Sequence, residues 1–223
     1  MKIKKGIILL FVASIAVACL SCKKNNGDLP PAAMVPAYLK VVNLTSDTIN
    51  VYQNGSRINN NTSFNPLGSA GYDVIAAGTQ QYQIKKAGSP DVMISLPLSL
   101  DSAKTYSLFI TGTSADRIFT INDVISNSND VYVRYVNASP GGVFDVKIGR
   151  TINAASIAFK GETAFFKTDT GRNKFQIFTA GNSTPLSEGT LTLVAGRVYT
   201  LYTKGTVGAT GSNAFAARLL TNK

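Results

Sequence analysis

The chain has 223 residues, with 22 basic and 12 acidic side chains, a formal net charge of +10, two cysteines, and neither histidine nor tryptophan. Because histidine is the commonest general base and metal ligand near neutral pH, its absence excludes Ser-His-Asp and Cys-His catalysis and the usual zinc sites. We also find no two of the twelve carboxylates close together with a partner that would tune one of them. The sequence therefore predicts a protein that is not an enzyme and has no catalytic residue, metal or cofactor.

The N-terminal segment has the pattern of an export signal. Lys2, Lys4 and Lys5 precede a thirteen-residue apolar run at 6–18, and this arrangement predicts a signal peptide over residues 1–21. A permanent transmembrane anchor is the alternative. The uncharged stretch ends at Lys23 after seventeen residues, at the short limit for a bilayer span of about twenty, so a cleaved signal is favoured.

The junction Leu20–Lys24 (L-S-C-K-K) resembles the lipobox of bacterial lipoproteins, in the S-C-K-K form frequent in Bacteroidota-type sequences. The resemblance implies that the signal is cut before Cys22, that the thiol of this residue is acylated, and that the protein is an outer membrane lipoprotein. Cys19 ends a competing lipobox, Ala16–Cys19, and stays the alternative site. An acidic run that directs some such lipoproteins to the surface is missing after Cys22, so both a periplasm-facing and a cell-surface orientation stay open.

Residues 22–36 are rich in Pro, Asn and Gly and have no periodicity, so we expect a flexible tether. Cleavage before Cys22 would leave 19 basic and 12 acidic residues, a net charge of +7. These basic residues are spread along the chain, whereas nucleic-acid-binding proteins cluster them on one face with interleaved aromatics. We therefore expect a solvated, mildly basic surface and no nucleic-acid partner, with weak attraction to anionic glycans as the alternative.

Short runs in which apolar and polar residues alternate occupy residues 37–122. In Ile49–Gln53, for example, Ile49 and Val51 alternate with polar Asn50, which fits a strand with one solvated face. About seven such runs, separated by turn residues, predict a first β-sandwich of the immunoglobulin type. The polar segment 122–130 indicates a domain boundary, and similar runs over residues 130–223 predict a second sandwich.

The two predicted sandwiches are related by an internal repeat. Leu100–Gly112 and Leu193–Gly205 match at an offset of 93 residues, and the same offset aligns Tyr82–Gly88 with Phe175–Gly181. A register held over several blocks indicates a tandem of two similar units. The predicted fold class is therefore all-β, with two tandem immunoglobulin-like antiparallel β-sandwich domains after a lipoprotein signal peptide.

Three stretches of the second repeat resemble the family DUF4397: Val133–Pro140 (V-R-Y-V-N-A-S-P), Phe144–Gly149 (F-D-V-K-I-G) and Ala195–Leu201 (A-G-R-V-Y-T-L). The first repeat matches less fully, through Lys40–Ser46 and Ile49–Gly55. The resemblance implies two tandem repeats in an exported, lipid-anchored sandwich protein. It supplies no established active site.

The residues that the repeats share have structural interpretations. We expect Tyr106 and Tyr199 to fix a sandwich corner through their hydroxyl groups. We expect Asn43 and Asn137 to bond the local backbone and set a turn after the first strand. Four repeated glycines are interpreted as turn positions with positive φ: Gly78, Gly88, Gly171 and Gly181.

Three other features of the sequence are candidates for a functional role. The loop Asn54–Ser63 is rich in side chains that bond sugars, although a solvated connection is the plainer interpretation. Asp47–Ile49 and Asp101–Ala103 resemble the Asp-Ser/Thr-aliphatic signal for O-glycosylation in Bacteroidota, and three-residue patterns also recur by chance. Gly205–Gly211 is not a phosphate loop, because no Lys follows its final Gly.

Two functional hypotheses result, both non-catalytic. The first is a lipid-anchored cell-envelope protein acting as an interaction, adhesion or scaffold module that contacts an envelope protein, for instance by β-augmentation at a strand edge. The alternative is a glycan-binding accessory lipoprotein in polysaccharide capture. The sequence assigns no ligand-binding residue to either hypothesis, and the one site that it predicts is the lipidation of Cys22.

Overall fold

The computed structural model describes residues 35–59, 62–124, 128–149 and 151–223, although the side chains of 151–153 are not described. The predicted signal peptide, Cys19, Cys22 and nearly all of the predicted tether lie outside this range. Residues Val35–Lys223 form one compact unit. Within the described part of the chain, no helix has the length and hydrophobicity needed to cross a membrane.

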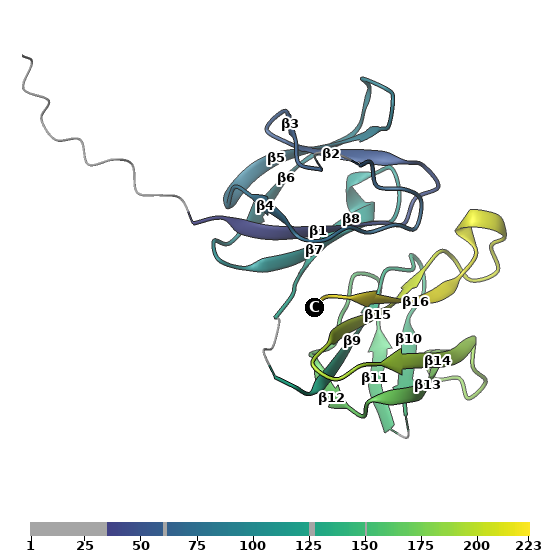
Figure 1. The fold of residues 1–223 in the computed structure, drawn as a ribbon. Coiled ribbons are helices and arrows are strands. Elements are labelled where there is room, and N and C mark those ends of the chain that lie inside the picture. Colours follow the sequence, from purple (N-terminus) through teal and green to yellow (C-terminus); the bar gives the residue numbers. More distant parts are fainter. Residues whose placement is uncertain (1–34, 60–61, 125–127, 150) are drawn as a thin grey trace, which may run out of the picture. The chain divides into compact units, whose positions relative to one another are not determined.

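The first sandwich consists of two four-stranded sheets (Figure 1). One has the strand order β4-β1-β7-β8 and is here called the β1 sheet, and the other has the order β3-β2-β5-β6 and is called the β2 sheet. The strands are β1 (Ala37–Asn43), β2 (Ile49–Gln53), β3 (Ser56–Arg57), β4 (Asp73–Ile75), β5 (Gly78–Lys86), β6 (Val92–Leu100), β7 (Thr105–Ile110) and β8 (Ile118–Asn122), with a short 3-10 helix η1 (Ala115–Arg117) before β8.

The second sandwich repeats this arrangement. Its β9 sheet has the order β12-β9-β15-β16, and its β10 sheet has the order β11-β10-β13-β14. The strands are β9 (Val131–Asn137), β10 (Phe144–Ile148), β11 (Thr151–Ile157), β12 (Phe166–Thr168), β13 (Gly171–Thr179), β14 (Ser187–Leu193), β15 (Val198–Lys204) and β16 (Ala216–Thr221), with a 3-10 helix η2 (Gly211–Asn213) before β16.

The strand registers of the two sandwiches are also equivalent. Gly78 on β5 pairs with Leu100 on β6, and Gly171 on β13 pairs with Leu193 on β14, so both pairs are related by the offset of 93 residues found in the sequence. The prediction of an all-β protein built from sandwiches is confirmed, and the shared topology is consistent with a tandem of two similar units.

One pairing in each sandwich differs from the expected antiparallel arrangement. The first strand pairs in parallel with the seventh, as β1 with β7 and β9 with β15. The first and second strands therefore lie in different sheets, whereas the immunoglobulin order places them together. Hydrophobic alternation reports which face of a strand is buried, but it does not report the direction of the neighbouring strand, so this detail was not predicted.

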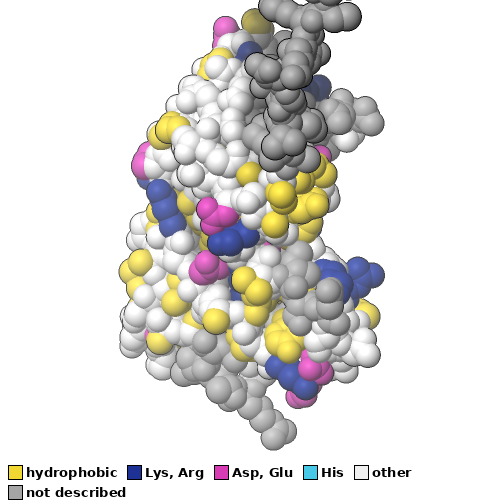
Figure 2. Space-filling view, turned by 90° about the vertical axis from the view of Figure 1, so that its left-hand side faces the viewer, with side chains coloured by type: hydrophobic (Ala, Val, Ile, Leu, Met, Phe, Trp, Pro, Cys, Tyr) yellow, Lys and Arg dark blue, Asp and Glu magenta, His cyan; other side chains and the backbone are white. Residues whose placement is uncertain are grey.

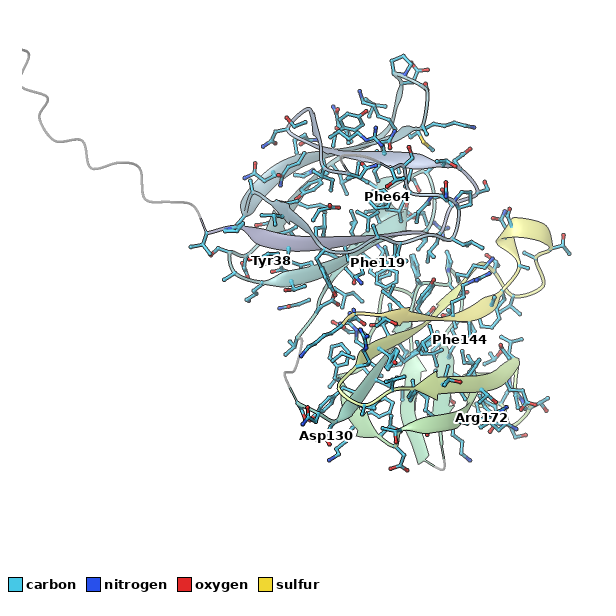
Figure 3. The ribbon with its side chains drawn as sticks, viewed as in Figure 1. Tyr38, Phe64, Phe119, Asp130, Phe144 and Arg172 are labelled. Carbon is cyan, nitrogen blue, oxygen red and sulfur yellow. The ribbon has the colours of Figure 1, made fainter. Side chains whose placement is uncertain are left out.

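Each sandwich has its own hydrophobic core between its two sheets. Phe64 and Ile84 belong to the first core, and Phe144 belongs to the second, where its ring centroid lies 5.0 Å from that of Phe215 (Figure 3). A third cluster of buried residues combines side chains of both repeats. We call it the junction cluster, and it consists of Val42, Leu44, Phe109, Phe119, Ile121, Val136, Ala138, Tyr202 and Leu220.

The junction cluster explains why four strands are buried on both faces. All seven residues of β15 are buried, and β1, β7 and β9 are buried along most of their length. In β1, Leu39 and Val41 face the first core, whereas Val42 belongs to the junction cluster. The β1 and β9 sheets thus bury their second faces against each other, which is typical of strands that hold the centre of a layered structure.

Candidate binding groove beside Arg134

The two repeated tyrosines occupy equivalent positions and make the same hydrogen bond. The hydroxyl of Tyr106 accepts a bond of 3.1 Å from the backbone N–H of Asp101, and the hydroxyl of Tyr199 accepts one of 3.2 Å from that of Val194. Each tyrosine thereby ties its strand to the residue that follows the preceding strand. Their predicted role as structural corner residues is confirmed.

The two repeated asparagines are fully buried and make more bonds than a turn requires. The Nδ2 of Asn137 donates to the backbone oxygens of Gly142 and Ile157, both at 2.9 Å, and its Oδ1 accepts from the N–H of Ser139 at 2.9 Å. Asn43 likewise donates to backbone oxygens, including that of Phe64 at 3.0 Å. The predicted turn is confirmed, and each side chain also links its strand to a segment about twenty residues away.

The four repeated glycines have the backbone conformation that was predicted. Their φ angles are +81° at Gly78, +80° at Gly88, +85° at Gly171 and +78° at Gly181. Because a side chain is strained in this region of backbone space, the turns account for glycine at these four positions.

The Asn-rich loop is partly a structural element. Asn59 is buried and donates from Nδ2 to Asn50 Oδ1 at 2.9 Å and to Thr62 O at 2.8 Å. Its amide is therefore committed within the first sandwich. The first residue of the loop, Asn54, is exposed and bonds the side chain of Gln80 at 2.5 Å. Two residues of the loop, 60 and 61, lie outside the described range.

The two short glycosylation-like patterns differ in exposure. The middle residue of the second pattern, Ser102, is exposed, whereas the middle residue of the first, Thr48, is half-buried. The backbone oxygen of Thr48 also accepts a hydrogen bond from Ala87 at 2.8 Å. Glycosylation of either residue stays a prediction.

The most unusual side chain in the described chain is Arg134, which is only 1% exposed on β9. Its guanidinium pairs with the carboxylates of Asp123 and Glu162, the latter at 2.8 Å. Its Nη1 also donates to the backbone oxygen of Asn122 at 3.0 Å, and its Nε donates to Thr200 Oγ1 at 3.0 Å. Every nitrogen of the guanidinium is therefore engaged, as a buried charge requires.

Both carboxylate oxygens of Asp123 also have partners. Its side chain is fully buried, with one oxygen facing Arg134. The other oxygen accepts hydrogen bonds from the hydroxyl groups of Tyr72 at 2.6 Å and Ser107 at 2.7 Å. Burial is the first cause of a raised pKa for Tyr72, and the neighbouring Asp123 carboxylate adds to it. The phenol therefore stays neutral and donates its proton to Asp123.

A groove of about 550 Å³ opens beside this ion pair. It is lined by Asn122, Val124, Tyr132, Arg134, Glu162, Thr163, Ala164 and Phe165. The guanidinium carbon of Arg134 lies 4.6 Å from the centroid of the Phe165 ring, so the charged group and the ring hold each other in place. Val124, 70% exposed, adds an apolar wall.

Three polar groups in the groove have no hydrogen-bond partner among the described residues. They are the side-chain amide of Asn122, the hydroxyl of Tyr132 and the second carboxylate oxygen of Glu162. The Glu162 carboxylate is 38% exposed. Its pKa is raised chiefly by burial, an effect that the charge of Arg134 opposes. The groove thus presents free hydrogen-bonding groups next to aromatic and aliphatic side chains.

The charged groups in and behind the groove differ in exposure. Arg134, which lines the groove, and Asp123, which lies behind it, are buried and bonded to each other, whereas Glu162 faces the open space. Acid–base catalysis needs a titratable group that reaches its substrate, usually together with a second one. Among the described residues, no cluster of three or more carboxylate or cysteine side chains has the geometry to hold a metal ion.

Sequence reasoning missed Arg134, Asp123 and Glu162. A signal was present, because Arg134 interrupts an otherwise apolar strand and stands where the first repeat has Lys40, another cation. In the sequence, however, Arg134 is also part of the family-like opening of the second repeat, Val133–Pro140. The pairing with Asp123 could not be seen, because it depends on the packing of the β9 sheet against the first sandwich.

Figure 2 shows one face of the molecule, on which basic and acidic side chains lie close together among small hydrophobic groups. This mixture of signs on the visible, described surface agrees with the expected spread of the basic residues.

Comparison with known families finds a match in the second half of the chain. Residues 131–223 match the family model DUF4397, a domain of unknown function. The second sandwich is a DUF4397 domain. The resemblance inferred from Val133–Pro140 and the later motifs is confirmed for this part of the chain, and the match does not extend to the first repeat. No curated protein matches the chain.

Two solved structures are similar to the chain, with low sequence identity and low TM-scores. One is the family CBM26 module CBMbc of Amy13K from Eubacterium rectale, in complex with maltoheptaose, with 10% identity, a TM-score of 0.27, and coverage of 82% of this chain and 96% of that one. The other is the Bacillus anthracis TIE protein, with 12% identity, a TM-score of 0.27, and coverage of 84% and 44% respectively. At such TM-scores, neither likeness bears on the function of this chain.

Proposed function

We propose that this protein is a non-catalytic binding module of the cell envelope that is held at the membrane by acylated Cys22 and contacts an envelope partner. The observation that carries the proposal is the groove beside Arg134. Its buried ion pair fixes the walls, and its free groups face outward. Such a site offers shape and hydrogen bonds to a partner and offers no group arranged for turnover.

The junction cluster supports a scaffold role. Because the β1 and β9 sheets share buried apolar residues, the two sandwiches are expected to behave as one body under a common unfolding transition. A rigid body loses little conformational entropy when it binds, which favours affinity. The tether predicted over residues 22–36 would let this body stand off the membrane.

A glycan-binding accessory role is the second candidate. It is favoured by the free Asn122 amide, Tyr132 hydroxyl and Glu162 oxygen, since hydrogen-bonding groups beside apolar walls are typical of small-molecule sites. The protein-partner and glycan proposals share the groove and differ in what occupies it.

The anchor is tested by metabolic labelling of the full chain with radioactive palmitate, with and without globomycin. We expect label on the wild type and on Cys19→Ala, and none on Cys22→Ala. Label retained by Cys22→Ala and lost by Cys19→Ala would move the acylation site to Cys19. The absence of label from all three forms would refute the anchor.

The groove is tested with a matched pair of substitutions at exposed alanines. Ala164→Arg places a long side chain in the groove, whereas Ala155→Arg places the same side chain on β11, in the opposite sheet of the sandwich. Envelope partners are first identified by cross-linking to the full-length lipoprotein, and their affinity is then measured with purified components. We expect Ala164→Arg to abolish binding and Ala155→Arg to preserve it. Equal affinity for both variants would refute the groove as the contact site.

A further inference from the structure

The groove has the size and lining of a small-molecule site. Its volume of about 550 Å³ falls within the range of roughly 300–1,000 Å³ that is usual for ligand pockets. The side chains of Tyr132, Phe165 and Val124 supply aromatic and aliphatic surface. A ligand that fits must therefore have an apolar face of its own.

The free polar groups require that the same ligand also forms several hydrogen bonds. The amide of Asn122 both donates and accepts, as does the hydroxyl of Tyr132, whereas the free oxygen of an ionised Glu162 only accepts. Because these groups are spread over β8, β9 and the segment before β12, a ligand that satisfies all three must carry polar groups at several points along its edge.

The charge of the site disfavours anionic ligands. The guanidinium of Arg134 is 1% exposed, and each of its three nitrogens already donates to an oxygen of the protein, so it is poorly placed to clamp a phosphate, sulfate or carboxylate. Asp123 and Glu162 together carry two negative charges against the single positive charge of Arg134. Lys40 lies close enough to Asp123 to interact with it, but it does not line the groove. Among the residues that line the groove, the exposed charge is that of Glu162. Lys167, the cation next to Tyr132, is paired with Asp130 at 2.9 Å.

The walls of the groove are held in place before any ligand arrives. Arg134 bonds Glu162 at 2.8 Å and lies 4.6 Å from the ring centroid of Phe165. It is itself fixed by Asp123 and by Thr200 Oγ1 at 3.0 Å. Positioning residues that are locked by their own neighbours reduce the entropy lost on binding. Arg134 is thus a positioning residue for both the carboxylate and the ring.

From this combination we propose that the groove is a saccharide subsite for neutral or amine-bearing sugars. A pyranose ring has an apolar C–H face that packs on Tyr132 and Phe165, and a rim of hydroxyl groups that bonds Asn122 and Glu162. An amino group on the sugar would gain further from the Glu162 charge. This assignment rests on the proposed binding function and specifies the ligand class for the same groove.

The first test is a glycan array probed with the labelled double variant Cys19→Ser/Cys22→Ser, in which neither candidate cysteine can be acylated. The array holds N-acetylglucosamine oligomers, their de-N-acetylated amine forms, neutral hexose oligomers and galacturonate oligomers. We expect saturable binding to neutral or amine-bearing chains and none to galacturonate. Silence across the neutral and amine chains, or binding to galacturonate alone, would overturn the saccharide assignment.

The second test locates the sugar by titration calorimetry with the best-binding array oligomer. Tyr132→Phe removes only the free hydroxyl, and Tyr38→Phe removes the hydroxyl at the corresponding place on β1, outside the groove (Tyr38 is labelled in Figure 3). We expect about fivefold weaker binding for Tyr132→Phe, corresponding to the loss of one hydrogen bond, and unchanged binding for Tyr38→Phe. Thermal unfolding of both variants serves as the folding control.

The outcomes separate this inference from the proposed function. If sugar binds but Tyr132→Phe and Tyr38→Phe behave alike, the groove is not the subsite, and the glycan role stands elsewhere on the protein. If no neutral or amine sugar binds while Ala164→Arg abolishes binding of a protein partner, the saccharide inference is wrong and the proposed binding function holds. If both assays are negative, both proposals fail.

Discussion

Lys40 on β1 and Arg134 on β9 occupy equivalent positions and reach across the junction in opposite directions. The Nζ of Lys40 donates to Thr221 O at 2.8 Å, at the end of β16, and the Nη1 of Arg134 donates to Asn122 O at 3.0 Å, at the end of β8. Each cation also lies 4.6 Å from the centroid of an aromatic ring, Tyr72 for Lys40 and Phe165 for Arg134.

The residues that follow Asn122 and Thr221 continue the correspondence. Ser107 donates to Asp123 at 2.7 Å, and Thr200, its equivalent at an offset of 93 residues, donates to Asn222 at 2.7 Å. Reciprocal contacts between equivalent residues are the mark of a two-fold interface between identical subunits. Here two repeats of one chain form such an interface. The equivalent positions 123 and 222 hold an aspartate and an asparagine, so Arg134 has a buried carboxylate partner there and Lys40 has a neutral amide.

Removing Arg134 is expected to destabilise the protein strongly. Arg134→Met leaves Asp123 buried without its cation, and breaking a buried pair in this way typically costs about 3–5 kcal/mol. Urea unfolding measures the change. Adding Asp123→Asn should recover part of the loss, because the amide carries no charge and is the residue found at the equivalent position, 222. The exposed pair partner Lys104 is the control, since Lys104→Met should leave the free energy of unfolding near that of the wild type. If Arg134→Met had the same free energy of unfolding as the wild type, the Arg134–Asp123 pair would not have the stabilising role assigned to it.

Asn137→Ala should destabilise the second sandwich by about 3 kcal/mol, because it leaves several buried backbone groups without partners, at roughly 1–3 kcal/mol each and not fully additive. The groups concerned are the oxygens of Gly142 and Ile157 and the N–H of Ser139. Chemical denaturation of the variant beside Asn182→Ala, which alters an exposed asparagine, measures the difference. Equal stability of the two variants would show that the bonds of Asn137 contribute nothing.

The two corner tyrosines should have equal effects. Tyr106→Phe and Tyr199→Phe each remove one hydroxyl that accepts from a backbone N–H, so each should lower the free energy of unfolding by about 0.5–1.5 kcal/mol. Tyr52→Phe is the control, because the hydroxyl of Tyr52 has no hydrogen-bond partner among the described residues. Thermal and urea unfolding measure the stability of the three variants. If one corner variant were as stable as Tyr52→Phe, the two tyrosines would not share a role.

Stability should depend on pH through Lys40. Burial lowers its pKa below the ordinary value of 10.5, and the neighbouring Asp123 carboxylate only partly opposes this. The folded state therefore releases the proton more readily than the unfolded state, so the contribution of Lys40 is least favourable below the folded pKa and improves as pH rises toward 10.5. Urea unfolding between about pH 7 and pH 10 should show wild type gaining stability relative to Lys40→Met. If the difference in stability between wild type and Lys40→Met stayed constant over this pH range, the lowered pKa of Lys40 would be contradicted.

The amino-acid sequence was enough to predict the strand content, the repeat and several residues that shape it. Positive φ at Gly78 and Gly171 and the hydroxyl bonds of Tyr106 and Tyr199 were predicted from local pattern and from a constant offset. The DUF4397 character of the second repeat was predicted from the resemblance of three of its motifs to that family. These features could be predicted because each depends on residues near one another in the chain or on comparing one repeat with the other.

The parallel pairing of β1 with β7 and the burial of Arg134 against Asp123 became visible only in the folded protein. Alternation along a strand shows that a face is buried, but it does not show what covers that face. The second faces of the β1 and β9 sheets are covered by each other, and this packing places a charged side chain, a carboxylate from another segment and two aromatic rings around one groove. The candidate site therefore arises from contacts between distant segments, for which a single sequence carries no periodic signal.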